Sequence, residues 1–133
     1  MGSAALWRRL EGIGIVLIAL HSFLIGVALL VATRWVLDFA GWTGIESLFF
    51  PRQSGAFHIV LALGYLIEHR RTGGISLLIL AKATAVVFLL VLSPAVTSWS
   101  VKFSGVFDGL MLAGMVGVRL MLRRALGDGR VVR

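Results

Sequence analysis

The chain has 133 residues, of which 59% are hydrophobic and only 14% are charged. A soluble domain of this length would carry far more charge, so the composition predicts an integral membrane protein. The absence of cysteine excludes disulfides, thiolate metal sites and cysteine nucleophiles. The net charge of +7 comes mostly from residues that flank apolar runs, where they meet lipid headgroups, so we predict no nucleic-acid partner.

Four apolar runs predict four transmembrane helices. A helix needs roughly 20 apolar residues to cross a bilayer, and only the second run is clearly shorter. Pro51 suits the first turn of the second helix, where its missing N–H is harmless, and Pro94 is expected to end the third. Residues 94–103 are expected to form a loop that holds Trp99 and Lys102. The predicted spans cover about residues 12–32, 52–69, 75–93 and 104–122.

Residues 34–50 have a different character. They mix Trp and Phe side chains with Asp38 and Glu46. This composition is typical of an amphipathic segment that lies on the membrane surface rather than crossing it. Gly41 and Gly44 are expected to break the segment into short pieces.

Positive residues are unevenly distributed between the two ends of these helices. Cytoplasmic loops of membrane proteins carry an excess of Lys and Arg, so the richer side, which holds both termini, is predicted to be cytoplasmic. The sequence therefore predicts an all-α fold, an integral membrane four-helix bundle formed by a single domain, 1–133. The richer side holds Arg8, Arg9, Arg70, Arg71, Arg123, Arg124, Arg130 and Arg133, and the other holds Arg34, Arg52 and Lys102.

Lys82 lies near the middle of the third predicted helix. A charged amine at that depth costs roughly 3 kcal/mol on insertion scales, so it needs a partner. Asp108, about one turn inside the fourth helix, is within reach of the flexible lysine stem. We predict an ion pair that fixes the register of two antiparallel helices. A proton or ion relay is the functional alternative for the same two residues.

Small residues recur every four positions along the fourth predicted helix. Such a stripe lets a neighbouring helix approach closely, and it predicts a packing face beside Asp108. The stripe consists of Gly105, Gly109, Ala113 and Gly117.

Polar side chains line one face of the second predicted helix, by the 3.6-residue period. They are Ser54, His58, Tyr65 and Glu68, and we expect them to face inward, towards His21 and Lys82. This polar cluster is either a hydrogen-bonded seam or the lining of a small cavity for a quinone headgroup or a similar ligand. His21 and His58 are also candidate axial ligands of a haem, although straight helices place them at different depths.

Three runs carry a family resemblance: LFFPRQSGAFHIVLALGYL, AKATAVVFLL and FDGLMLAG. They resemble small bacterial four-helix membrane proteins of broadly DoxX-like layout, most of which are uncharacterised. The resemblance implies a location in the bacterial inner membrane and matches Lys82 and Asp108 to intramembrane charged positions. Some proteins of this group resemble accessory subunits of membrane redox systems, and the resemblance implies no catalytic residue.

No Walker-type loop, His-Glu-x-x-His pattern or G-x-S-x-G elbow occurs, so we predict that the protein is not an enzyme. The main hypothesis is an accessory or structural transmembrane subunit of a larger complex, with respiratory and photosynthetic complexes as candidate hosts and no cofactor of its own. Its expected partners are the bilayer and other membrane subunits. One alternative is a binding or carrier protein for a lipophilic molecule such as a quinone, held in a polar cavity between the helices. The predicted ligand-lining residues are His21, His58, Tyr65, Glu68, Lys82 and Asp108. A weaker alternative is a b-type cytochrome.

Overall fold

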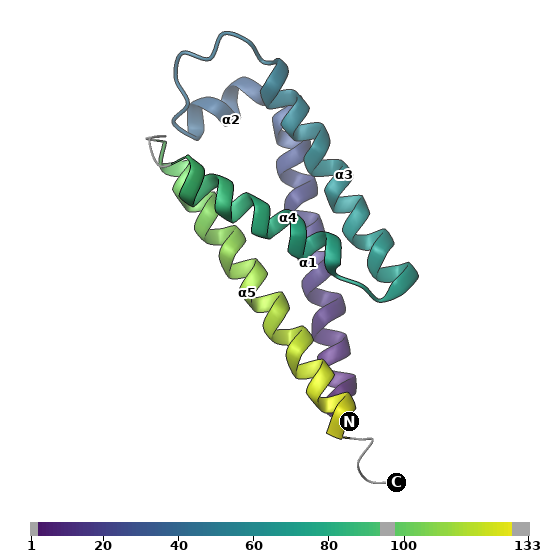
Figure 1. The fold of residues 1–133 in the computed structure, drawn as a ribbon. Helices are drawn as coiled ribbons and strands as arrows, with labels where there is room; N and C mark the ends of the chain where they lie inside the picture. The colour runs from purple at the N-terminus through teal and green to yellow at the C-terminus, as the bar shows by residue number, and fades with distance from the viewer. Residues whose placement is uncertain (1–2, 94–97, 129–133) are drawn as a thin grey trace.

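The chain is all-helical over the residues that the computed structural model describes, 3–93 and 98–128 (Figure 1). No strand occurs in these two ranges, so the predicted all-α class is confirmed. Pro94, Arg130 and Arg133, which entered the predictions above, lie outside the described residues. The elements are α1 (Ser3–Val31), α2 (Thr33–Phe39), α3 (Phe49–Thr72), α4 (Ser76–Val86), the π-helix η1 (Val87–Leu92) and α5 (Trp99–Asp128).

The start and end of α3 follow local chemistry. Pro51 lies in its first turn, as predicted, where no N–H is needed. Gly73 ends the helix in the left-handed region, with φ of 65°, and its N–H donates to the His69 carbonyl at 2.9 Å. Glycine adopts this conformation without the penalty that a Cβ brings. The chain can therefore turn sharply at Gly73, directly after α3.

α1 begins before its predicted span and α3 and α5 extend beyond theirs at both ends, whereas α4 and η1 together stay within residues 75–93. The predicted loop at 94–103 is wrong over its last residues, because α5 begins at Trp99 and includes Lys102. Ser98 precedes that helix, and its carbonyl accepts a hydrogen bond from the Val101 N–H at 3.2 Å. Serine is a favoured residue at this position of a helix, and hydropathy alone does not register that preference.

The third predicted helix changes its winding along its length. It is α-helical through α4 and continues as the six-residue π-helix η1. The π-helical hydrogen bond spans one residue more than the α-helical one, so side chains in η1 do not follow the 3.6-residue period. A prediction that treats this segment as one straight α-helix misplaces the faces of its last turns.

Only part of the predicted surface segment is helical. In α2, Thr33 and Leu37 are buried, whereas Trp35 and Phe39 remain 66% and 65% exposed. The helix therefore packs one face against the rest of the chain, and its two large aromatic side chains lie on the outer face. The remainder, up to residue 48, has no regular helix.

Side-chain hydrogen bonds join the connection after α2 to α2 itself and to α5. Gly41, with φ of 78°, lets the chain leave the helix. Arg34 Nη1 donates to the Ile45 carbonyl at 2.7 Å, and Trp42 Nε1 donates to Ser100 Oγ at 3.2 Å. These bonds fix the connection against α2 on one side and the start of α5 on the other.

The four long segments pack as neighbouring helices (Figure 1). α1 contacts both α3 and α5, and α4 contacts both α3 and α5. Ile15 of α1 and Leu78 of α4 are the most deeply buried large side chains. The core cluster consists of Ile15, Ile18, Ala19, Ala62, Tyr65, Ile75, Leu78 and Met115.

Two glycines bring α1 and α3 into backbone contact. A Cβ added at Gly26 would lie 2.7 Å from the Gly55 carbonyl oxygen, and one added at Gly55 would lie 2.8 Å from the Gly26 carbonyl oxygen. A real Cβ does not tolerate such distances, so both positions require glycine at this helix spacing. Small residues at a helix interface permit this close approach.

The predicted small-residue stripe on α5 is divided between two environments. A Cβ at Gly105 would lie 2.6 Å from Leu90 of η1, and one at Gly109 would lie 3.7 Å from a side chain of α4. Ala113 is exposed, and a Cβ at Gly117 would have nothing within 4 Å. Only the first half of the stripe therefore packs against the rest of the chain.

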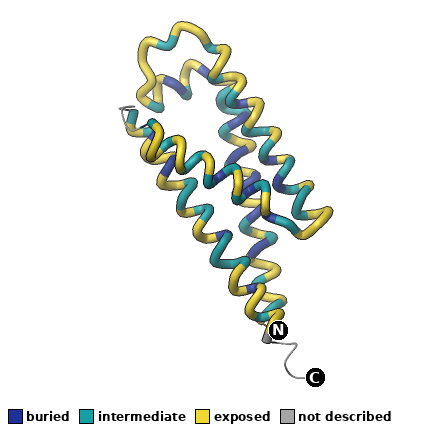
Figure 2. Tube along the Cα trace, in the orientation of Figure 1, coloured by how far each residue is buried: buried dark blue, intermediate teal, exposed yellow. Residues whose placement is uncertain are grey.

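Exposed residues occur along all of the helices (Figure 2), and many of them are large and apolar. Ser3–Val31 and Trp99–Gly127 are long and apolar enough to cross a membrane, and only 28% and 17% of their most apolar windows are buried. The α4–η1 segment is apolar but shorter. Leu17 of α1, Val60 of α3 and Leu110 of α5 are each more than half exposed. Of the four predicted spans, the first and the fourth are thus long and apolar enough on their own to cross a membrane.

Candidate functional site

The ion pair predicted between Lys82 and Asp108 is present. Lys82 Nζ of α4 lies 2.5 Å from Asp108 Oδ1 of α5, and the two side chains are only 8% and 15% exposed. Each charge neutralises the other where neither has much water. The pair joins the two antiparallel elements at one depth and so sets their register.

His21 and Tyr65 lie close to this pair. Tyr65 of α3 is 3% exposed and belongs to the core cluster with Leu78, which lies one turn before Lys82 on α4. His21 of α1 lies beside Phe107, the residue before Asp108 on α5, with ring centroids 5.2 Å apart. Four of the six predicted ligand-lining residues, namely His21, Tyr65, Lys82 and Asp108, therefore come from four helices into one neighbourhood.

Two members of the predicted polar face on α3 are engaged locally. His58 Nδ1 lies 2.8 Å from the Ser54 carbonyl, so that nitrogen carries the proton and donates it within α3. Glu68 faces away from the cluster, because its carboxylate accepts the N–H groups of Ser76 and Leu77, each at 2.9 Å. A carboxylate in this position satisfies donors that the first turn of α4 leaves free, and it interacts favourably with the helix dipole.

A second buried ion pair was not predicted. Arg119 Nη2 of α5 lies 2.6 Å from Glu11 Oε1 of α1, and Glu11 is only 3% exposed. The same Nη2 donates to the Gly73 carbonyl in the α3–α4 turn at 2.6 Å. The contact with Glu11 lacks the alignment of a hydrogen bond, so it acts as an ion pair. Arg119 therefore connects α1, α5 and the α3–α4 turn at one point.

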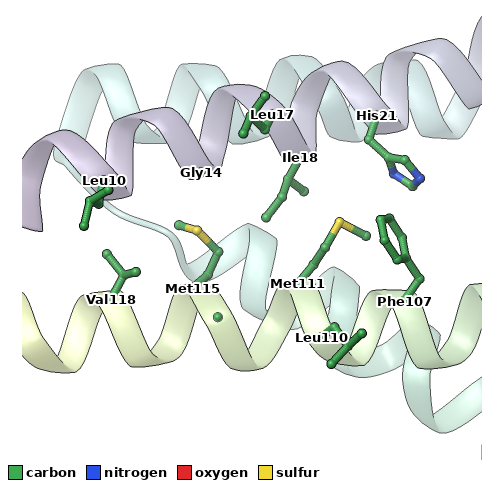
Figure 3. A pocket seen from close by; sticks show the side chains of 11 residues that line it. Leu10, Gly14, Leu17, Ile18, His21, Phe107, Leu110, Met111, Met115 and Val118 are labelled. Atoms are coloured by element: carbon green, nitrogen blue, oxygen red, sulfur yellow. The ribbon is translucent and has the colours of Figure 1, made fainter.

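An open cavity of about 380 Å³, a groove on the surface of the molecule, lies between α1 and α5 (Figure 3), and Leu17 and Leu110 of its lining are more than half exposed. His21 and Phe107 face each other at one end, and Leu10 and Val118 lie at the other. The side chains of Met111 and Met115 extend between the two helices. The lining consists of Leu10, Gly14, Leu17, Ile18 and His21 of α1 and Phe107, Leu110, Met111, Gly114, Met115 and Val118 of α5.

His21 is the polar side chain of this lining. Its ring centroid lies 5.2 Å from that of Phe107, at an interplanar angle of 52°. His21 Nδ1 is buried and has no hydrogen-bond partner within the described parts of the chain. A buried imidazole nitrogen without a partner is uncommon, because losing water without replacement costs roughly 1–3 kcal/mol.

An aromatic row leads from α2 to this histidine. Its ring centroids lie 5.2 to 6.0 Å apart from one ring to the next, within the range of aromatic contacts. The row consists of Trp35, Phe39, Trp99, Phe103, Phe107 and His21.

The predicted quinone cavity and the observed cavity differ in position. The prediction placed the ligand among the polar side chains of α3, whereas the cavity lies between α1 and α5 and shares only His21 with that cluster. No helical period within one segment indicates this cavity, because residues of two helices distant in sequence form it. Within residues 3–93 and 98–128, no group of three or more His, Asp or Glu side chains is placed to hold a metal ion.

The chain matches none of the protein-family models, curated proteins or solved structures with which it was compared.

Proposed function

We propose that the chain is a multi-pass protein of the bacterial inner membrane, in which α1, α3, the α4–η1 segment and α5 each cross the bilayer. This arrangement accounts for the large apolar side chains that these segments expose. It also accounts for the two ion pairs, since charged groups within a bilayer must find partners inside the protein. The α2 helix, with its exposed aromatic side chains, lies at the membrane surface.

In this proposal the end of the molecule where α1 begins and α3 and α5 end is cytoplasmic. The exposed side chains of Arg8, Arg9, Arg70, Arg71, Arg123 and Arg124 lie there. The opposite end has fewer positive residues within the described ranges, namely Arg34, Arg52 and Lys102. The excess follows the positive-inside rule.

The protein acts, in this proposal, as a non-enzymatic accessory subunit of a larger membrane complex. The observation that supports this role is the unused half of the small-residue stripe on α5, where Ala113 is exposed and Gly117 has no neighbour. A transmembrane helix of another subunit packs against such a surface because its backbone can approach closely. The Lys82–Asp108 pair then has a structural role and needs no transport function.

The alternative of a b-type cytochrome does not fit the geometry of α1 and α3. A porphyrin held by His21 and His58 would have to lie between these helices, whose backbones touch at Gly26 and Gly55. That contact lies within two helical turns of both histidines, so the helices have no room for a haem there. We therefore do not propose haem as a cofactor.

Native mass spectrometry of gently solubilised membranes tests the subunit role. We expect a stoichiometric complex with a different membrane chain, and we expect Gly117→Leu to abolish it because the new side chain blocks close approach. Leu110→Ala, which changes an exposed residue of the same helix, is the matched control and should retain the complex. A free monomer, a homodimer alone, or a complex that persists unchanged in Gly117→Leu would contradict the proposal.

A further inference from the structure

The cavity between α1 and α5 has the size of a small-molecule site. Ligand pockets range from about 300 to 1,000 Å³, are mostly apolar and contain a few polar groups that fix the orientation of the ligand. This cavity, of about 380 Å³, has apolar walls and His21 at one end. A polar group at one end and apolar walls along the rest suit an elongated amphipathic molecule.

Two pairs of buried charges near the cavity neutralise each other, whereas the exposed Arg8 and Arg9 lie beside Leu10, at the end away from His21. Lys82 is bound to Asp108, and Arg119 is bound to Glu11. A charged headgroup would find no free opposite charge among these four side chains. The remaining polar group is the His21 imidazole, which makes no hydrogen bond to a described residue. Its Nδ1 is enclosed by protein atoms, so Nε2 is the ring nitrogen that can meet a ligand. The cavity thus favours a ligand that is neutral and can hydrogen-bond to an imidazole.

The surroundings of His21 favour a flat ring. The Phe107 ring lies beside the imidazole, and the flexible thioether of Met111 extends into the same space (Figure 3). Aromatic and sulfur-containing side chains both make favourable contacts with planar rings. From this end the cavity continues along Gly114, where a Cβ would have nothing within 4 Å, towards Leu10 and Val118. An aliphatic chain fits that apolar path.

We propose that the α1–α5 cavity binds a neutral lipophilic molecule of the quinone class, with its carbonyl-bearing ring at His21 and Phe107 and its aliphatic chain along Gly114. This site differs from the subunit contact proposed at Gly117, and it does not depend on that contact. His21 supplies the hydrogen bond, and the apolar walls supply most of the buried surface.

Binding to the full chain in lipid nanodiscs tests the site. The probes are a decyl-substituted benzoquinone and decylbenzene, which share a chain and differ in the ring carbonyls. Equilibrium binding of each radiolabelled probe gives an affinity, and the probe-dependent rise in melting temperature gives an independent readout. We expect the wild type to bind the quinone about tenfold more tightly than decylbenzene, the effect of one hydrogen bond to a polar group.

Two variants and one control locate the ligand. Gly114→Leu fills the cavity without meeting another residue and should abolish binding of both probes, whereas Gly117→Leu, on the same helix outside the lining, should bind both as the wild type does. His21→Phe keeps a ring beside Phe107 but removes the hydrogen bond, so it should bind both probes with equal affinity. The result for His21→Phe can be interpreted even if Gly114→Leu does not fold.

Several results would overturn the proposal. They are equal affinity of the wild type for both probes, retention of the quinone preference in His21→Phe, and undiminished binding in a folded Gly114→Leu. Loss of binding in Gly117→Leu would also overturn it, because the ligand would then lie on the outer face of α5. Loss of a partner subunit in Gly117→Leu with probe binding intact would separate this site from the subunit contact.

Discussion

Removing one charge of the Lys82–Asp108 pair should destabilise the protein far more than removing both. At the observed 2.5 Å and an effective dielectric of about 20, the attraction between the charges is roughly 6–7 kcal/mol, much of it offset by their desolvation. Lys82→Met or Asp108→Leu alone leaves a buried charge without a partner, at a cost of roughly 3–5 kcal/mol. The double variant leaves neither charge and should be about as stable as the wild type.

Reversible unfolding in mixed micelles of the wild type, the two single variants and the double variant measures the coupling free energy between the two charges. Lys102→Met is the control, since Lys102 is an exposed lysine of α5 and its loss should change the unfolding free energy by less than about 0.5 kcal/mol. Single variants as stable as this control would refute the reasoning. So would a double variant whose destabilisation equals the sum of the two singles, because the coupling between the charges would then be absent.

Three further predictions concern helix packing and the helix ends. Gly26→Ala should cost roughly 1–3 kcal/mol in unfolding experiments because its Cβ meets the backbone of α3, whereas Gly117→Ala, with no neighbour, should be neutral or slightly stabilising. Arg119→Met should increase amide hydrogen exchange around Gly73, because it removes both the donor to the Gly73 carbonyl and the positive charge beside Glu11; unchanged exchange there would contradict this. Glu68→Ala should cost about 1 kcal/mol by removing the acceptor at the start of α4, and exchange should rise in that first turn rather than elsewhere.

The sequence predicts one of the two ion pairs and not the other. Lys82 and Asp108 lie inside apolar runs, where a charge must have a partner, so their pairing follows from the cost of leaving either alone. Glu11 and Arg119 lie near the ends of their runs, where a long side chain can equally reach the membrane boundary. Nothing in either run distinguishes an end residue that reaches outward from one that pairs inward.

Packing between helices is the part that a single helical period does not predict. The four-residue spacing on α5 correctly indicates a surface of small residues, but it does not indicate that Gly105 meets η1 while Gly117 meets nothing. The backbone contact between Gly26 and Gly55 joins two isolated glycines from different runs. Each glycine permits the close approach of α1 and α3 because the other glycine faces it. Which residues face each other depends on how the chain connects the two helices through α2.

The polar face of α3 shows how local hydrogen bonds change a prediction. Helical periodicity places His58 and Glu68 on one side of the helix. The chain then offers nearer partners, a carbonyl one turn back for His58 and the free N–H groups of α4 for Glu68. His21 has no such partner for Nδ1 among the described residues, and it is the member of the predicted cluster that reaches the cavity.

The aromatic row between α2 and His21 gives the protein an optical signal of its own. Trp35 and Trp99 each contact Phe39, and the row continues to the histidine of the cavity. Aromatic rings held in fixed, asymmetric contact produce near-ultraviolet circular dichroism, which disappears when specific packing is lost. The docking of α2 onto the start of α5 can therefore be followed without a label, in the same sample that serves for the binding and unfolding experiments.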